Sequence, residues 1–284
     1  MITDAEAISL YEDYMRFRNL QPGTINVRHR YLGKFSREVG FATATEQNIV
    51  TWLSRPLNPK TRSMFISTLH SFFSWALRGD NGKPIYPSVE VTDDDGKVSH
   101  IQHVPTASIE KPRTHARHPR PMPTDDIRKA LDLADPVMKC FIACGAYEGM
   151  RCQEIAFLAI EDLNETTGTL EITHGKGAKQ RYVPLHPEVL KAIKQLPPPS
   201  EGRLWPNETA ASVSRRGNRF LHSIGISSTM HQLRHFFGTS IYQQSGGDIV
   251  LTSGLLGHSS IATTQTYAAA DQSKASGVVS GLTI

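Results

Sequence analysis

Six side chains in the second half of the chain have the chemical types needed for reactions at a phosphate group. Guanidinium and ammonium groups bind anionic oxygens, imidazoles transfer protons, and a phenol can act as a covalent nucleophile. The six residues are Arg151, Lys176, His231, Arg234, His258 and Tyr267. Glu154 follows Arg151 by three residues, a spacing that lets both share one helix face. Together, groups of these types could bind an anionic phosphate and attack it.

Each of these residues also has an ordinary structural explanation. An Arg151–Glu154 pair is typical of a helix surface, and Lys176 between two glycines is typical of a solvated hairpin tip. His258 is typical of a helix cap or a buried histidine, and Tyr267 is typical of a half-buried packing residue. Considered one at a time, the residues indicate only a mostly helical, weakly basic protein of two domains.

Considered together and in order, the residues and their surroundings resemble the tyrosine recombinase, or phage integrase, family. The matching segments are GMRCQEI, THGKGAKQRYVPL, MHQLRHFFGTSI and LLGHSSIATTQTY. The resemblance implies that the six residues above occupy the catalytic positions of the family and that Glu154 supports them. It extends weakly to the N-terminal helices, which resemble the core-binding domain of the family.

The chemistry of a phosphodiester explains why such residues are needed. Attack builds negative charge on a crowded phosphorus, and two guanidiniums such as Arg151 and Arg234 can bind the non-bridging oxygens in a bidentate manner. Stabilisation of developing charge is usually the largest catalytic contribution. His231 and His258 can donate to the same oxygens or exchange a proton with the nucleophile.

The resemblance implies the remaining steps. Lys176 corresponds to the general acid that protonates the leaving 5′-oxygen, and Tyr267 to the nucleophile that forms a 3′-phosphotyrosyl link. A second strand's 5′-hydroxyl then reverses that link, so neither ATP nor a metal nor any other cofactor is expected. Consistent with this, the chain has no G-x-x-x-x-G-K-[ST] motif, and GKGAK resembles it only superficially.

Hydrophobic periodicity predicts four short helices in the N-terminal part. They span about residues 5–19, 23–40, 43–53 and 58–79, the third capped by Thr43 with Glu46 three residues later. A hairpin around TDDDGKV follows. In the C-terminal part we expect a helix capped by Thr124, a helix after Arg151, and a strand, turn and strand in TLEITHGKGAKQRYVPL. Further helices are expected around residues 187–195, 210–222, 231–243, 249–256 and 260–269.

These elements predict a mostly α fold with a small β-hairpin or sheet, in two domains. Residues 1–103 form a helical core-type DNA-binding domain, 104–121 a basic, proline-rich linker, and 122–284 the catalytic domain with a C-terminal tail. The net charge of +4 and the pI of about 8.9 suit nucleic acid, and most of the excess charge lies in the linker. The candidate DNA contacts are Arg28, Arg30, Lys34, Lys60, Arg62, Lys111, Arg113 and Arg117. Ordinary exposure to solvent explains the presence of these charged side chains nearly as well as DNA binding does.

Several other classes of protein are disfavoured. Cys140, Cys144 and Cys152 are too few for a disulfide framework, and the first two suit core packing better than metal binding. His231 and His235 have the spacing of a zinc motif, but Gln232 replaces its catalytic glutamate. No apolar run reaches the ~18 residues of a membrane span, and the first residues lack the features of a secretory signal. We therefore expect a protein of the bacterial cytoplasm or nucleoid.

The sequence predicts a site-specific DNA recombinase that cuts and rejoins DNA and integrates or excises phage or mobile-element DNA. Its expected partners are double-stranded attachment or core sites without distant arm sites, three further copies in a tetramer, and a possible directionality or host factor. A recombinase that resolves chromosome dimers is an alternative, and a type IB topoisomerase is a weaker one. A DNA-binding protein that kept the fold without the activity, and a zinc enzyme using His231 and His235, complete the alternatives.

Overall fold

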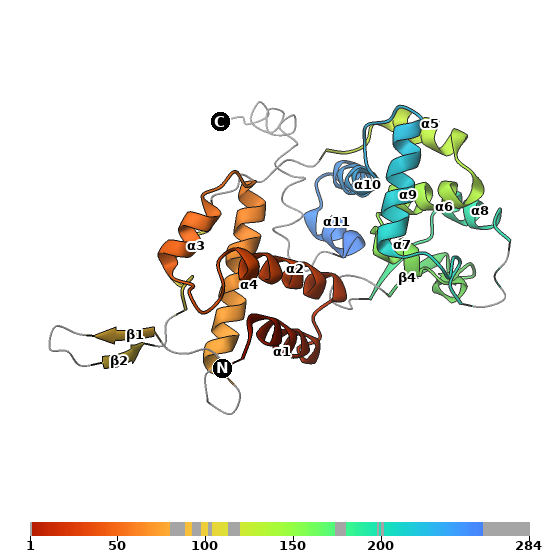
Figure 1. The fold of residues 1–284 in the computed structure, drawn as a ribbon. Helices are drawn as coiled ribbons and strands as arrows, with labels where there is room; N and C mark the ends of the chain where they lie inside the picture. Colours follow the sequence, from red (N-terminus) through yellow and green to blue (C-terminus); the bar gives the residue numbers. More distant parts are fainter. Residues whose placement is uncertain are drawn as a thin grey trace, which may run out of the picture. The chain divides into compact units, whose positions relative to one another are not determined.

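The computed structural model describes residues 2–79, 89–92, 98–101, 104–112, 120–173, 180–197, 199 and 202–257. The chain forms two compact units, Met1–His115 and Ala116–Ile284 (Figure 1). Each unit has its own hydrophobic core, so each is described by itself. The predicted helix at 260–269 and the C-terminal tail lie outside the described residues. No described helix is long and apolar enough to cross a membrane.

The described residues of the first unit form four helices, as predicted. They are α1 (Asp4–Phe17), α2 (Pro22–Glu38), α3 (Glu46–Leu53) and α4 (Pro59–Arg78). The side chain of Asn58 caps α4, whose first residue is a proline, a position where the missing N–H has no helical partner in any case. The predicted cap of α3 is wrong by two residues. Thr45 caps it by accepting from the Asn48 backbone, whereas Thr43 donates to the Val39 carbonyl at the end of α2.

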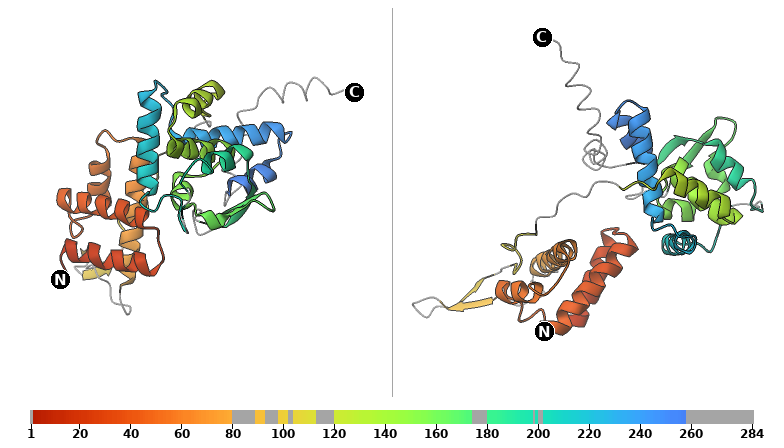
Figure 2. Two further views of the ribbon diagram at one scale, coloured as in Figure 1. Left: turned by 90° about the vertical axis from the view of Figure 1, so that its right-hand side faces the viewer. Right: turned by 90° about the horizontal axis from the view of Figure 1, so that it is seen from above.

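An aromatic cluster fills the interior of the first unit. α1, α2 and α4 pack against one another, as the red and orange helices show (Figure 2). Phe41 and Phe72 lie 4.3 Å apart between ring centroids, and Trp52 meets Phe65 edge to face at 4.9 Å. Burying each large apolar side chain contributes about 1.5–3 kcal/mol, so this core holds the bundle together.

Two further segments complete the first unit. β1 (Val89–Thr92) and β2 (Val98–Ile101) pair antiparallel and confirm the predicted hairpin strands. Residues 104–112 then lie against the bundle: Thr106 is buried, with its hydroxyl 3.2 Å from His70 Nδ1, and Ile109 packs on the aromatic cluster. The first part of the predicted linker is therefore ordered against the helices, while 113–119 lie outside the described residues.

The second unit is built around α6 (Pro136–Tyr147), a helix buried along most of its length. Where the structure describes this unit, its other helices are α5 (Thr124–Leu133), α7 (Cys152–Phe157), α8 (Pro187–Ile193), α9 (Ala210–Ser223), α10 (Met230–Gln244) and α11 (Ile249–Leu256), with a 3₁₀ turn at Ile160–Asp162. Thr124 is the first residue of α5 and not its cap, because Pro123 occupies the cap position and no side chain bonds there.

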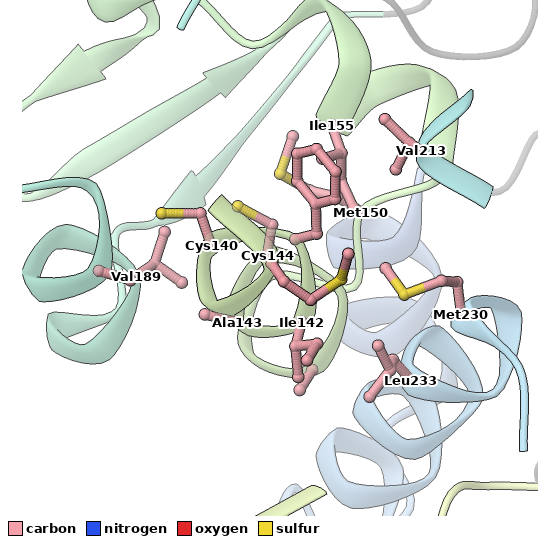
Figure 3. Packing of buried hydrophobic residues seen from close by; sticks show 14 of the residues in the cluster. Cys140, Ile142, Ala143, Cys144, Met150, Ile155, Val189, Val213, Met230 and Leu233 are labelled. Atoms are coloured by element: carbon pink, nitrogen blue, oxygen red, sulfur yellow. The ribbon is translucent and has the colours of Figure 1, made fainter. Parts of the chain in front are cut away.

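The two cysteines of α6 confirm the packing interpretation. Cys140 and Cys144 are fully buried, and Figure 3 shows apolar side chains of α7, α8, α9 and α10 gathered around this part of α6. Burial raises the pKa of Cys140 to about 12, with a further contribution from Asp135. A thiol that stays protonated is a poor nucleophile and metal ligand, so these residues serve the core.

A small antiparallel sheet covers part of this core, in the order β3 (Leu163–Asn164), β4 (Thr169–Ile172) and β5 (Arg181–Pro184). β4 and β5 are the predicted strand pair, and β3 is an additional strand. Ile172 pairs with Arg181 in the last described register position before residues 174–179. The fold is thus mostly helical with a three-stranded sheet, as the sequence predicted.

Candidate active site

Glu154 lies at the centre of a cluster of three arginines. Its side chain is 0% exposed. Arg151 Nη1 donates to Glu154 Oε1 at 2.7 Å, and the Arg151 backbone N–H donates to Oε2 at 2.8 Å. Arg181 binds both carboxylate oxygens at 2.9 Å, and Arg234 Nη1 lies 3.9 Å from Oε2. One buried carboxylate therefore orients guanidiniums from a helix start, a strand and a second helix.

The turn between α6 and α7 places Arg151 at this site. Arg151 is the N-cap residue of α7, and Glu154 is the third residue of that helix, so their spacing closes a capping interaction. Gly149 precedes them with φ at +60°, and a Cβ on it would lie 2.4 Å from the Phe237 ring. Only glycine meets both requirements, so the turn holds Arg151 in one place.

Arg234 connects this turn to the end of α11. Its side chain is 3% exposed. Nη1 donates to the Gly149 carbonyl at 2.5 Å, and Nη2 donates to the Leu256 carbonyl at 2.6 Å. Backbone carbonyls at a helix C-terminus lack helical donors and carry partial negative charge. The guanidinium of Arg234 thus joins three segments that are distant in sequence.

The electrostatics of the cluster favour an anion. Burial opposes the ionisation of Glu154, but the hydrogen bonds and charges of Arg181 and Arg151 outweigh it and lower its pKa to about 2. One carboxylate faces three guanidiniums, so the site retains positive charge. Arg151 is the most open of the three, with 26% of its side chain exposed against 8% for Arg181. An anionic ligand would therefore reach Arg151 first.

A second buried carboxylate, Glu148, lies in the same turn, and its pKa is shifted in the opposite direction to that of Glu154. Burial raises its pKa to about 7, although its Oε1 accepts from the His186 backbone N–H at 2.7 Å and Arg181 lowers the pKa by its charge. Among the described interactions no guanidinium donates a hydrogen bond to Glu148, in contrast to Glu154. Glu148 is therefore partly protonated near neutral pH.

His231 and His235 lie on successive turns of α10, with ring centroids 4.6 Å apart. His231 is exposed and His235 is half-buried. Burial, together with the charges of His231 and Arg234, lowers the pKa of His235 to about 4, so its ring is neutral at pH 7. Within the part of the chain that the structure describes, no three His, Cys, Asp or Glu side chains group as metal ligands would.

The structure brings together Arg151, Glu154 and Arg234 of the predicted site, and places His231 one turn before Arg234 on α10. Lys176, His258 and Tyr267 lie outside the described residues. Two of these residues are close in sequence to described ones. Lys176 falls within 174–179, between the paired strands β4 and β5, and His258 follows Gly257 directly.

The predicted DNA contacts of the first unit differ in their surroundings. Arg28 is half-buried and donates to Tyr11 Oη at 2.9 Å and Ser71 Oγ at 3.1 Å. Arg62 donates to the Leu53 carbonyl at 3.0 Å and so caps α3. Arg30, Lys60 and Lys111 are exposed, and Lys34 is half-buried near Glu38. Arg113 and Arg117 lie outside the described residues.

Sequence reasoning overlooked Arg181. One signal was present, because the β5 residues alternate between buried and exposed, and Arg181 shares the buried face with Val183. A charged residue on an inward strand position needs a buried partner. The sequence analysis did not single out Arg215 and Arg219, which are exposed one turn apart on α9. α9 contacts α10, the helix of His231 and Arg234, where Asn218 accepts from the Met230 backbone.

Comparison with known proteins identifies relatives over nearly the whole chain. The tyrosine recombinase XerA of Pyrococcus horikoshii is 24% identical, with 94% of this chain and 90% of the relative covered. The tyrosine recombinase XerD of Staphylococcus epidermidis is 25% identical, with 91% and 93% covered.

Two solved structures share the fold. One is the XerH site-specific recombinase bound to a palindromic difH substrate, with a TM-score of 0.69, 23% identity, and 93% of this chain and 81% of that chain covered. The other is a lambda integrase tetramer bound to a Holliday junction, with a TM-score of 0.67, 16% identity, and 92% and 78% covered. The family model described as the phage integrase family matches residues 121–274, more than half of the chain. The chain therefore belongs to the phage integrase family of tyrosine recombinases, which cleave and rejoin DNA.

Proposed function

We propose that this chain is a site-specific recombinase that cuts DNA through a 3′-phosphotyrosyl link to Tyr267 and rejoins it to another strand. The observation that carries the proposal is the convergence of Arg151 and Arg234 on buried Glu154, with 2.7 and 3.9 Å separations. A prepositioned pair of guanidiniums stabilises the charge that develops on an attacked phosphate without reorganising during the reaction. Their order along the chain agrees with the family motifs.

The remaining catalytic roles follow from the same family pattern. In this proposal His231 and His258 donate to the phosphate or exchange a proton with Tyr267. Lys176 protonates the leaving 5′-oxygen, so that the backbone bond is exchanged for the phosphotyrosyl bond without an external energy source. In the reverse step a 5′-hydroxyl attacks the phosphorus and the Tyr267 phenol leaves.

Trapping the covalent intermediate tests the proposal. Incubation with a nicked duplex, which loses a short fragment after cleavage, should accumulate a protein–DNA adduct that peptide mapping locates at Tyr267. Tyr267→Phe should still bind the duplex but form no adduct. Tyr182→Phe is the matched control, because this phenol lies on β5 and is 63% exposed. An adduct in Tyr267→Phe, or loss of the adduct in Tyr182→Phe alone, would overturn the assignment.

The proposed partner is double-stranded DNA, bound by four copies of the chain on two duplexes and acting where bacterial DNA lies. XerH is described on difH DNA, and lambda integrase as a tetramer on a Holliday junction, which supports this assembly. Arg28 and Arg62 bond groups of the first unit itself, so the other six predicted contacts remain our candidates. Exposed Arg215 and Arg219 of α9 join them. Each phosphate contact that is removed should reduce the salt dependence of binding.

We propose integration or excision of mobile DNA as the biological role, with dimer resolution as the second candidate. The family description names phage integrases, whereas the relatives with nearly full coverage are Xer recombinases. Selection of bound duplexes from random DNA would yield the core site. Efficient recombination between two identical short sites favours resolution, and a requirement for two different partner sites favours integration.

A further inference from the structure

Arg181 donates to three oxygen atoms from two distant segments with one guanidinium. Nη1 and Nη2 each donate to one oxygen of Glu154 at 2.9 Å, and Nε donates to the Leu255 carbonyl at 2.9 Å. The first partner follows Arg151 in α7, and the second belongs to the last turn of α11. The side chain is 8% exposed, so few water molecules compete for these bonds.

Arg181 also contacts the residue that leads to the C-terminal catalytic segment. Gly257 ends α11 with φ at +62°, and a Cβ on it would lie 2.9 Å from Arg181 Cδ. His258 follows directly in the sequence, and Tyr267 follows nine residues later. Arg234 binds the next carbonyl, that of Leu256, at 2.6 Å. Two arginines therefore fix the last turn of α11 against the Glu154 cluster.

We infer that Arg181 is a positioning residue for DNA cleavage: it ties the end of α11 to Glu154, and so aligns the segment of His258 and Tyr267 with Arg151. This inference rests on the proposed function. In this inference Arg181 acts through Glu154 and the end of α11, since all three of its nitrogens donate to them. Its effect should therefore appear in the rate of cleavage and not in DNA affinity.

The geometry requires an arginine. The planar guanidinium directs two parallel bonds to a carboxylate and a third bond from Nε along another edge. A lysine ammonium retains the charge that balances Glu154, but it cannot satisfy three acceptors in this plane. Arg181→Lys thus separates positioning from charge balance.

The experiment compares Arg181→Lys with Arg203→Lys. Arg203 is the matched control, because it lies in the second unit, is half-buried, and donates to the backbone carbonyls of Ala156 and Glu208 but not to Glu154. For each full-length variant the melting temperature, the DNA dissociation constant and the single-turnover rate of adduct formation are measured. Arg181→Lys should lose at least about tenfold in rate at saturating DNA, with an unchanged dissociation constant, while Arg203→Lys keeps its rate.

Arg181 is also close in sequence to residues 174–179, which include Lys176. A second substrate therefore distinguishes an effect on the Tyr267 segment from an effect on Lys176. A duplex with sulfur in place of the leaving 5′-oxygen needs no proton from an acid. It should restore cleavage by Lys176→Ala and leave Arg181→Lys slow. Restoration of the Arg181→Lys rate, or an Arg181→Lys rate equal to wild type on normal DNA, would overturn the inference.

A second variant tests the inference in case Arg181→Lys is not folded. If Arg181→Lys does not fold, Gly257→Ala perturbs the same contact while keeping the buried charge, and a slow rate that sulfur does not relieve supports the inference. An unchanged Gly257→Ala rate contradicts it. Failure of the wild-type protein to form any adduct would refute the proposed function instead, so the two failures are distinguishable.

Discussion

The arginines of the two units differ in the groups to which they donate hydrogen bonds. In the first unit Arg28 donates to two hydroxyls and Arg62 to carbonyls at the end of α3. Arg16 and Arg55 of this unit pair with separate carboxylates that are not fully buried. In the second unit Arg151, Arg181 and Arg234 converge on one carboxylate. The first pattern satisfies local acceptors, whereas the second concentrates positive charge. Residue type alone therefore does not indicate which arginines hold a substrate.

The concentrated arrangement is costly to fold. Removing ions from water costs several kcal/mol each, and their attraction compensates only when the geometry is good and the remaining donors are bonded. Here the carbonyls of Gly149, Leu255 and Leu256 supply those additional bonds. Such a cluster is a weak source of stability, and the more reasonable explanation for its presence is the anion that it can bind.

The largest effect should follow removal of the shared carboxylate charge. Glu154→Gln leaves three guanidiniums, two of them buried, without their counterion. This loss should lower the free energy of unfolding by about 3–5 kcal/mol. Urea denaturation at pH 7 measures it. Glu38→Gln in the first unit is the comparison, since Glu38 also binds an arginine but is exposed, and its effect should be much smaller. Equal effects would show that the two units do not differ in this way.

The next effect concerns the rate of cleavage. Arg234→Lys should slow formation of the Tyr267 adduct by about 10²–10³-fold, the loss typical of removing one donor that stabilises developing charge. Single-turnover cleavage of a nicked duplex measures it. Arg62→Lys, which alters an arginine bonded to carbonyls in the first unit, should leave the rate unchanged. A comparable loss of rate in both variants would contradict a special role in cleavage for the arginines around Glu154.

A smaller effect is expected for Arg28. Hydrogen bonds that involve a charged group contribute about 1.5–3 kcal/mol, so Arg28→Met should destabilise the first unit by an amount in that range. Binding isotherms at several salt concentrations provide the second measurement, and the salt dependence should not change. A reduction equivalent to about one phosphate contact would instead establish Arg28 as a DNA ligand.

The last prediction concerns the dependence of stability on pH, which differs in sign for the two buried glutamates. The pKa of Glu148 is raised to about 7, so its contribution to stability is present below pH 4.5 and is lost as the pH rises towards 7. The pKa of Glu154 is lowered to about 2, so its contribution is present above pH 4.5 and is lost as the pH falls towards 2.

Glu148→Gln should remove the first dependence. The neutral amide can still accept from the His186 backbone, so the variant should gain stability relative to wild type between pH 5 and pH 8. Urea denaturation of both proteins across this range measures the difference. A constant difference would mean that Glu148 ionises normally in the folded protein.

The sequence allowed the helices, the hairpin strands and several site residues to be predicted, because each depends on neighbours in the chain. Apolar spacing marked α4, and three-residue spacing marked Arg151 and Glu154. Arg181 was overlooked since its partners lie 27 and 74 residues away. The cap of α3 was misplaced because Thr43 and Thr45 both suit that role, and only the path of the chain after α2 selects between them.

Trp205 gives the second unit its own optical reporter. Its indole Nε1 donates to the Ile155 carbonyl at 2.7 Å, directly after Glu154, and its ring meets Phe141 edge to face at 5.0 Å. Of the three tryptophans in the chain, the other two, Trp52 and Trp75, lie in the first unit. With those two replaced by phenylalanine, the fluorescence emission would come from a single indole bonded to the helix that carries the shared carboxylate. Loosening of that helix could then be followed in unlabelled protein.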